Sequence, residues 1–215
     1  LGYFFHFNLE DVGHISPERL GEFYESVVPS EYEQAIMGPG MQVPVQALAV
    51  EANIRPLANV AKGFGYFNVF PDPDGVVRQM PLMIQYRDVN TPFPPLALEV
   101  VKEYMKSLNG GDVQLVAIVQ PEETLVSVEV DDRQHVIPTD ERGQMLVNFY
   151  GKKGRFPYVS FTDVLNDRVD ARLFHKKIVI VGATATGIYD VRSTPGKTGS
   201  NGVERTSYIT VAVAP

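Results

Sequence analysis

The stretch that organises the chain runs from Gly63 to Arg78 and reads GFGYFNVFPDPDGVVR. Residues with a high strand propensity stand on both sides of its Pro-Asp-Pro-Asp-Gly segment. Proline and aspartate favour a tight turn, and Gly75 can adopt the positive φ that such a turn requires. The pattern predicts a prominent β-hairpin around residues 65–86, with Asp72, Asp74 and Gly75 as structural turn residues.

Outside the hairpin, strand-like and helix-like segments follow one another. A run of strand formers fills residues 1–7, and Ser16 followed by Pro17 is typical of a helix N-terminus. A longer helix is expected to start at Pro95, with an apolar stripe made by Leu96, Val100, Val101, Tyr104, Met105 and Leu108. Further strands are predicted over residues 113–119, 125–130 and 144–150, and a short helix over residues 160–165.

One apolar run, KIVIV over residues 177–181, has the continuous pattern of a strand buried on both faces. We therefore expect a mixed α/β (α+β) fold, in which a central mixed β-sheet is covered by helices. Residues 177–181 are predicted to be the central strand, and the helices that start at Pro17 and Pro95 are predicted to pack on this sheet. The length fits one or two domains, and we expect one domain over residues 1–215.

Composition excludes several classes of protein. The chain has 215 residues, no cysteine, four histidines and a net charge of −7. Disulfides, thiolate nucleophiles and cysteine-ligated zinc are therefore excluded, and the acidic balance argues against a nucleic-acid partner. The longest uncharged stretch, residues 34–50, contains glycines and prolines and is not a spanning helix. Because residue 1 stands inside a predicted strand, we interpret the chain as an excised, N-terminally incomplete piece of a longer protein. Its attachment to a membrane is expected only through flanking segments absent here.

Motifs that could carry catalysis or metal binding are incomplete. The predicted strand before Gly182 leads into a loop of the kind that cradles phosphates, but the lysine of a P-loop is missing. A nucleotide or phosphoester enzyme that uses the Gly182–Asp190 loop is an alternative interpretation. The segment 72–75 resembles part of a calcium loop, but Phe70 and Pro81 occupy ligand positions. No serine lies in a nucleophile elbow. We therefore predict no catalytic residue, no metal and no cofactor.

Several short motifs occur in the order in which they occur in one known family. They are GFGYFNV (63–69), DPDGVVR (72–78), FPPLAL (93–98), MLVNFYG (145–151), FPYVSFTDVL (156–165), the segment 174–187 and GVE (202–204). Together they resemble the type-two CHASE domain over residues 60–204. Two parts depart from the family. The acidic strand and helix of its first third are not found, and RTSYIT (205–210) stands where its last helix is expected.

The resemblance implies a non-enzymatic sensory domain outside the inner membrane, in the periplasmic or extracellular space. Such a domain detects a signal and controls a cytoplasmic adenylate or guanylate cyclase, histidine kinase or diguanylate cyclase in a bacterial transmembrane receptor, which is expected to be a homodimer. The signal would be a small molecule or an envelope component, and its predicted contacts are Arg78, Tyr86, Tyr189 and Asp190. Arg78 is the best partner for an anion. A cell-envelope binding module is a third interpretation, which an exposed apolar patch would favour.

Overall fold

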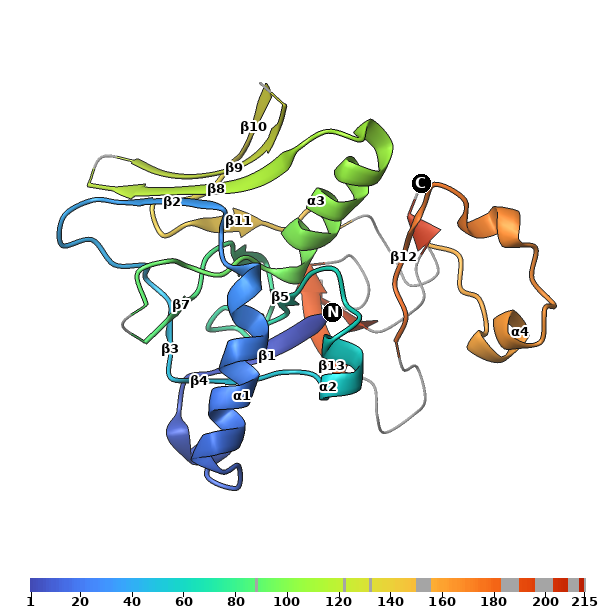
Figure 1. Ribbon diagram of the computed structural model, residues 1–215, viewed down its shortest axis with the longest axis horizontal. Helices are drawn as coiled ribbons and strands as arrows, with labels where there is room; N and C mark the ends of the chain where they lie inside the picture. The colour runs from blue at the N-terminus through green and yellow to red at the C-terminus, as the bar shows by residue number, and fades with distance from the viewer. Residues whose placement is uncertain are drawn as a thin grey trace. The chain divides into compact units, whose positions relative to one another are not determined.

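The computed structural model describes residues 1–87, 89–121, 123–131, 133–149, 156–182, 190–195, 203–208 and 213–214 (Figure 1). The chain divides into two compact units. The first unit comprises Leu1–Val69 and Gln79–Leu146, and the second comprises Phe70–Arg78 and Val147–Pro215. The single domain expected over residues 1–215 stays a prediction.

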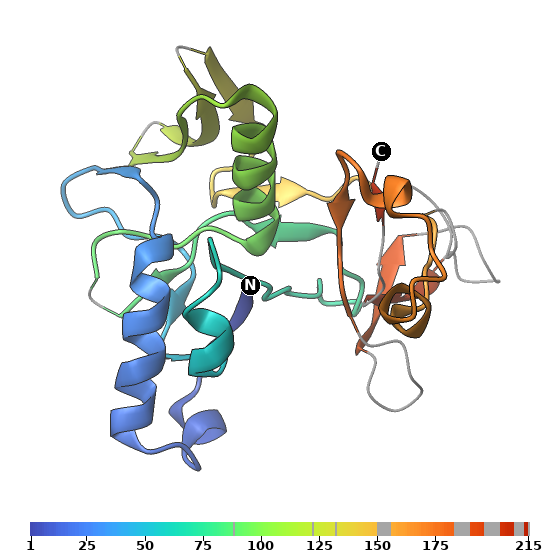
Figure 2. The same ribbon diagram turned by 45° about the vertical axis from the view of Figure 1, so that its right-hand side comes forward.

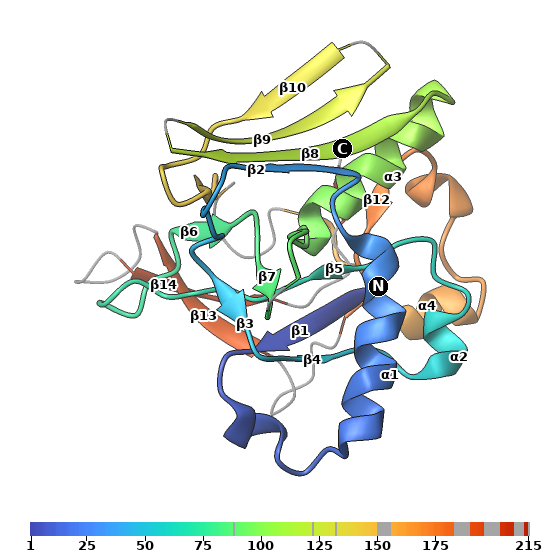
Figure 3. The same ribbon diagram turned by 60° about the vertical axis from the view of Figure 1, so that its left-hand side comes forward.

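The first unit contains a three-stranded sheet in the order β4-β1-β5 (Figure 3). Its middle strand, β1 (Gly2–His6), is antiparallel to β4 (Ala49–Glu51) and parallel to β5 (Gly65–Tyr66). Tyr3 and Phe5 point into the core and are 1% and 0% exposed, because alternate residues of a strand face opposite sides. The strand predicted at the start of the chain is confirmed.

Helix α1 (Pro17–Val27) begins where the sequence predicts it and packs against β4. The Ser16 hydroxyl accepts a hydrogen bond from the Arg19 amide at 3.3 Å, which satisfies one of the free N–H groups of the first turn. Phe23 and Val27 are buried. Short segments complete this part of the unit: η1 (Leu9–Val12), η2 (Val28–Ser30), β3 (Gln46–Ala47) and α2 (Arg55–Ala58).

A four-stranded sheet in the order β10-β9-β8-β2 belongs to the same unit (Figure 3). Strands β8 (Val113–Gln120), β9 (Glu123–Val130) and β10 (Arg133–Ile137) form antiparallel pairs, whereas β2 (Gln34–Met37) is parallel to β8. Helix α3 (Leu96–Asn109) packs against β8 and β9 and is seen lengthwise in Figure 2. The predictions of α3, β8 and β9 are confirmed, whereas β2 and β10 lie outside the predicted strands.

The main hydrophobic core of this unit lies between α3 and the four-stranded sheet. It combines alternate residues of β8 and β9 with Leu98 of α3, with Tyr32 and Val43, and with the segment Leu82–Met83. Since these side chains are nearly or fully buried, each contributes on the order of 1.5–3 kcal/mol of hydrophobic stabilisation. The sheet and the helix are therefore held together chiefly by this core.

The turn of the predicted hairpin forms, but its arms pair with other strands. The Gly75 amide donates to the Asp72 carbonyl at 2.8 Å, and Gly75 has φ 79°. β5 pairs with β1, β6 (Gln79–Pro81) pairs with β11 (Gln144–Leu146), and β7 (Gln85–Tyr86) pairs with β3. The hairpin expected around residues 65–86 is thus corrected to a turn whose arms have separate partners. Because Pro81 has no amide hydrogen, the return arm cannot form one uninterrupted ladder.

The second unit holds two short ladders and two short helices. β12 (Ile178–Val179) pairs with β15 (Val213–Ala214), β13 (Asp190–Pro195) pairs with β14 (Val203–Tyr208), and the helices are α4 (Phe161–Leu165) and η3 (Ala171–Phe174). The segment Phe70–Arg78, which contains the turn, is hydrogen-bonded to β13, since the Val77 amide donates to the Ser193 carbonyl at 2.8 Å. The short helix predicted over residues 160–165 is confirmed.

Residues 177–181 do not form a buried central strand, which corrects the prediction. Val179, Ile180 and Val181 are 38%, 52% and 68% exposed. Within the described residues β12 has a two-residue ladder with β15 and no second neighbour, so it is not the central strand of a sheet. In the first unit, α1 packs on β4 and α3 packs on β8. The predicted class, a mixed α/β fold with mixed sheets, is confirmed.

Candidate functional site

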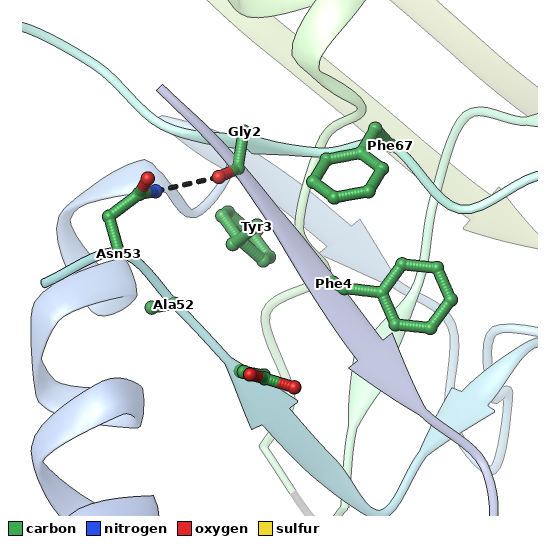
Figure 4. A pocket seen from close by; sticks show the side chains of 7 residues that line it. Gly2, Tyr3, Phe4, Ala52, Asn53 and Phe67 are labelled. Carbon is green, nitrogen blue, oxygen red and sulfur yellow. Dashed lines mark hydrogen bonds between the residues drawn. The ribbon is translucent and has the colours of Figure 1, made fainter. Parts of the chain in front are cut away.

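An open cavity of about 390 Å³ lies on the outer face of the three-stranded sheet (Figure 4). Its walls are Gly2, Tyr3, Phe4, Glu51, Ala52, Asn53 and Phe67. Phe4 and Glu51 are direct partners in the β1–β4 ladder, so their side chains leave the same face of the sheet. The side-chain amide of Asn53 donates to the Gly2 carbonyl at 2.7 Å and holds the segment after β4 against β1.

Two aromatic rings form one wall of the cavity. Phe4 and Phe67 are 37% and 52% exposed, and their ring centroids are 5.6 Å apart. Gly2 makes this arrangement possible, because a Cβ at this position would lie 2.7 Å from Cδ1 of Phe67. Figure 4 shows both rings on the same side of β1. Exposed rings beside a few polar groups are typical of small-molecule sites.

The polar wall of the cavity is acidic. Glu51 has a half-exposed carboxylate, whose Oε2 lies 3.3 Å from Nε2 of His6. A carboxylate and the faces of aromatic rings both attract a cation. The seven lining residues contain no nucleophile paired with a base. The cavity is therefore suited to bind a small polar or cationic molecule and offers no catalytic arrangement.

A buried ion pair on α3, Glu99 with Lys102, is joined by the partly exposed carboxylate of Glu33. The Lys102 ammonium donates to Oε1 of Glu99 at 2.6 Å and to Oε1 of Glu33 at 2.7 Å. The second oxygen of Glu33 accepts the Leu115 amide at 2.8 Å. Burial raises the pKa of Glu99, although the hydrogen bond from Lys102 opposes this shift. Burial alone would lower the pKa of Lys102, but its bonds to both carboxylates raise it.

Two buried tyrosines hold neighbouring carbonyls of the segment that enters the core. The Tyr66 hydroxyl donates to the Pro81 carbonyl at 2.6 Å, and the Tyr32 hydroxyl donates to the Leu82 carbonyl at 2.6 Å. Both rings are nearly or completely buried, at 0% and 3% exposure respectively. Without these donors, two buried carbonyls in succession would lose their side-chain partners. These contacts are structural, and they fix residues 81–82 relative to β5 and to the segment before β2.

Arg78, the predicted anion partner, is engaged by its own turn. Its guanidinium donates to Oδ2 of Asp72 at 2.6 Å and to both carboxylate oxygens of Asp74 at 2.9 and 2.7 Å. The hydrogen bonds from Arg78 lower the pKa of Asp74 to about 2. An anionic ligand at Arg78 would have to displace one of these carboxylates. The role of Arg78 as a ligand contact stays a prediction.

Tyr86 lies in the aromatic core of the first unit. Its ring stacks on Tyr24 with a centroid distance of 4.5 Å and lies 6.2 Å from the ring of Phe5. The Arg87 guanidinium lies 5.2 Å from the same ring, and Tyr86 is 6% exposed. Its predicted contact with a ligand is untested. Tyr86 does not line the cavity of Figure 4.

The remaining predicted contacts fall at the edge of the described chain. Tyr189 lies outside the described residues, and for Asp190 only the backbone, at the start of β13, is described. Residues 183–189 of the Gly182–Asp190 loop also lie outside the described residues, so this structure does not test the enzyme alternative. Among the described side chains, no group of three or more potential His, Asp or Glu ligands could hold a metal ion.

The cavity residues were not among the predicted contacts. The sequence does carry one signal for them, because alternation in β1 places Tyr3 and Phe5 on one side and Phe4 with the polar His6 on the other. A strand with a histidine on one face is expected to expose that face. The partners Glu51 and Asn53 could not be recognised, since they join β1 only through the pairing of distant segments.

A family model described as the CHASE2 domain matches residues 17–212 of the chain. The chain belongs to the CHASE2 family. The match extends on both sides of residues 60–204, over which the motifs resemble the family, and it spans residues of both units. CHASE2 domains are extracytoplasmic sensory domains and are typically non-catalytic. No curated protein and no solved structure shows significant similarity to the chain. In the part of the chain that the structure describes, no helix combines the length and apolar character needed to cross a membrane.

Proposed function

We propose that this CHASE2 domain is the extracytoplasmic sensory module of a bacterial transmembrane receptor. In this account it detects a signal outside the inner membrane and controls a cytoplasmic cyclase or kinase, and the receptor acts as a homodimer. The family match over residues 17–212 is the observation that carries the proposal. A signal can shift such a receptor only through its different affinities for two states of the module. A shift from 1:99 to 99:1 requires about 5.5 kcal/mol of preference.

For a small-molecule signal, we propose the cavity of the three-stranded sheet as the binding site. The support is chemical, because Phe4 and Phe67 offer exposed rings and Glu51 offers a carboxylate within one cavity. The cavity also connects three strands, since its residues belong to or follow β1, β4 and β5. A ligand that bridges them would stabilise the sheet in one arrangement, which is the kind of change a receptor can transmit.

Thermal unfolding of the chain against a panel of metabolites tests this proposal. The panel contains amines, amino acids, organic acids and sugars, together with ATP and GTP in the presence of magnesium. A ligand at 100 times its dissociation constant adds about 2.7 kcal/mol of stability, which corresponds to several degrees in the midpoint. We expect a shift with an amine or amino acid that is lost in Glu51→Gln, with Glu129→Gln on the other sheet as the control. A shift with nucleotide and magnesium alone would contradict the sensory account and support the enzyme alternative.

A further inference from the structure

All six methionines of the chain lie around one hydrophobic core. Met83 is buried within this core, and the other five are partly buried against it. These five are Met37, Met41, Met80, Met105 and Met145. They come from β2, the loop after β2, β6, α3 and β11. Among the described residues, seven partly buried hydrophobic side chains pack on this core, and five of them are methionines. We call these five residues the methionine rim.

The composition gives this rim a chemical meaning. The chain contains no cysteine, so the six thioethers are its only sulfur atoms. Methionine is oxidised to the sulfoxide under conditions that leave aliphatic side chains intact, and reductases reverse the reaction. The oxidation chemistry of sulfur in this chain is therefore confined to one core of the first unit.

Partial burial makes the rim both accessible and consequential. A thioether packs as an apolar group, whereas a sulfoxide is polar and requires hydrogen-bond partners. Met80 and Met145 face each other directly across the β6–β11 ladder, so oxidation of either residue places a polar group at this contact. Met83 is 2% exposed and should be protected. Its terminal carbon lies 2.6 Å from the position that a Cβ on residue 143 would occupy, so the methyl group lies close against Gly143.

We propose that the methionine rim is a modification site for two-electron oxidants. With hydrogen peroxide, the sulfur lone pair attacks one peroxide oxygen, the O–O bond breaks, an S–O bond forms, and water leaves after proton transfer. The sulfur is oxidised by two electrons, and the peroxide is reduced. The resulting sulfoxides loosen the packing of α3, β6 and β11 on the four-stranded sheet. This inference rests on the proposed sensory function. In it, an oxidant is a signal that the module converts into a change of its stability.

Peroxide treatment of the 215-residue chain, followed by peptide mass spectrometry and thermal unfolding, tests the proposal. We expect the five rim methionines to gain one oxygen each before Met83 does, and the unfolding midpoint to fall by roughly 4 °C or more. Methionine sulfoxide reductases of both stereospecificities should restore the midpoint. Oxidation of the rim with an unchanged midpoint would overturn the proposal, as would oxidation of Met83 first or no oxidation of the rim.

Leucine variants separate the rim from general oxidative damage. Met80→Leu combined with Met145→Leu conserves volume and should fold. We expect peroxide to lower the unfolding midpoint of this double variant measurably less than that of the wild type. Met37→Leu combined with Met41→Leu provides a second pair if the first does not fold. An equal fall in wild type and both pairs would overturn the proposal.

The full-length receptor distinguishes this inference from the proposed function. If peroxide lowers the midpoint but leaves the output of the receptor unchanged, the modification site stands, the rim is rejected as an oxidant sensor, and the proposed detection of a ligand at the cavity is not affected. If the output changes with oxidants in the wild type and in both leucine pairs alike, the receptor role stands and the methionine rim is rejected as the responsive element.

Discussion

The ammonium of Lys102 lies 2.6 Å from Oε1 of Glu99, three residues earlier on α3, and the two side chains are only 7% and 4% exposed. The Glu33 carboxylate shares the same ammonium. The side of α3 that faces the interior is therefore partly ionic. Because charges removed from water are stabilised only by their partners, the buried pair of Glu99 and Lys102 is sensitive to the loss of either member.

Substitution Lys102→Met should be strongly destabilising. It leaves Glu99 buried without its cation, and we expect a cost of about 3–5 kcal/mol in the free energy of unfolding, measured by urea denaturation. The double variant Glu99→Met with Lys102→Met removes both charges and should cost less than Lys102→Met alone. Lys106→Met is the matched control, since its 3.5 Å pair with Glu103 is partly exposed and should contribute less than about 1 kcal/mol. Equal costs for Lys102→Met and Lys106→Met would show that the buried network does not stabilise the unit.

At Gly65 the backbone of β5 lies close against the first residue of α3. A Cβ there would lie 2.5 Å from the backbone nitrogen of Leu96, and backbone cannot move aside as a flexible side chain can. We expect Gly65→Ala to cost at least about 1–3 kcal/mol. Gly21→Ala provides the control, because the exposed Gly21 in α1 has no atom within 4 Å of its added Cβ and should gain up to about 1 kcal/mol. Chemical denaturation measures the free energy of unfolding of both variants. If Gly65→Ala leaves it unchanged, the close contact between β5 and α3 is contradicted.

The two tyrosine hydroxyls that hold residues 81–82 should each matter for stability. Tyr66→Phe or Tyr32→Phe leaves a buried carbonyl without its donor, for an expected cost of about 1–3 kcal/mol per variant in urea denaturation. Tyr158→Phe is a control, since Tyr158 is 46% exposed. A cost no larger than that of Tyr158→Phe would mean that these carbonyls find other partners.

Stability should fall steeply in alkaline solution. Burial raises the pKa of Tyr3, Tyr32 and Tyr66 above the ordinary value. The unfolded chain loses these protons near pH 10 while the folded chain keeps them, so the stabilisation is complete below pH 10 and is lost as pH rises above it. Each tyrosine contributes up to about 1.4 kcal/mol per pH unit to this slope. Unfolding free energies measured from pH 9 to 11.5 should decline less steeply in Tyr32→Phe, and a slope unchanged by this substitution would contradict the assignment.

Local chemistry predicted the elements of the fold better than their partners. Ser16 with Pro17 and the segment ended by Gly110 locate α1 and α3, because capping and φ preferences act within a few residues. The predicted apolar stripe of α3 is partly wrong, because Val101 and Leu108 are 36% and 50% exposed. The structure instead buries Glu99 and Lys102. In the sequence alone, two opposite charges three residues apart on a helix cannot be distinguished from charges on its solvent-exposed face, because only tertiary contacts bury them.

The candidate site depends on pairings that local sequence does not specify. Phe4 and Glu51 are neighbours only because β1 pairs with β4. Phe67 lies beside them because β5, which it follows, pairs with the other edge of β1. Residues 177–181 are apolar but exposed, because an apolar run becomes a central strand only if other strands pair with it on both sides. Alternation in β1 was the one local clue to the open face.

The most direct test of the proposed sensory role measures the output of the receptor that we propose, a cyclase or kinase, in its native membrane. Receptors with Gly65→Ala and with Gly21→Ala are compared with wild type at equal membrane abundance. The account predicts that Gly65→Ala changes the output or its response to signal, because it disturbs the contact between β5 and α3 in the module, whereas Gly21→Ala does not. An output that stays at the wild-type level in Gly65→Ala, despite a measured loss of stability in the module, would contradict the account.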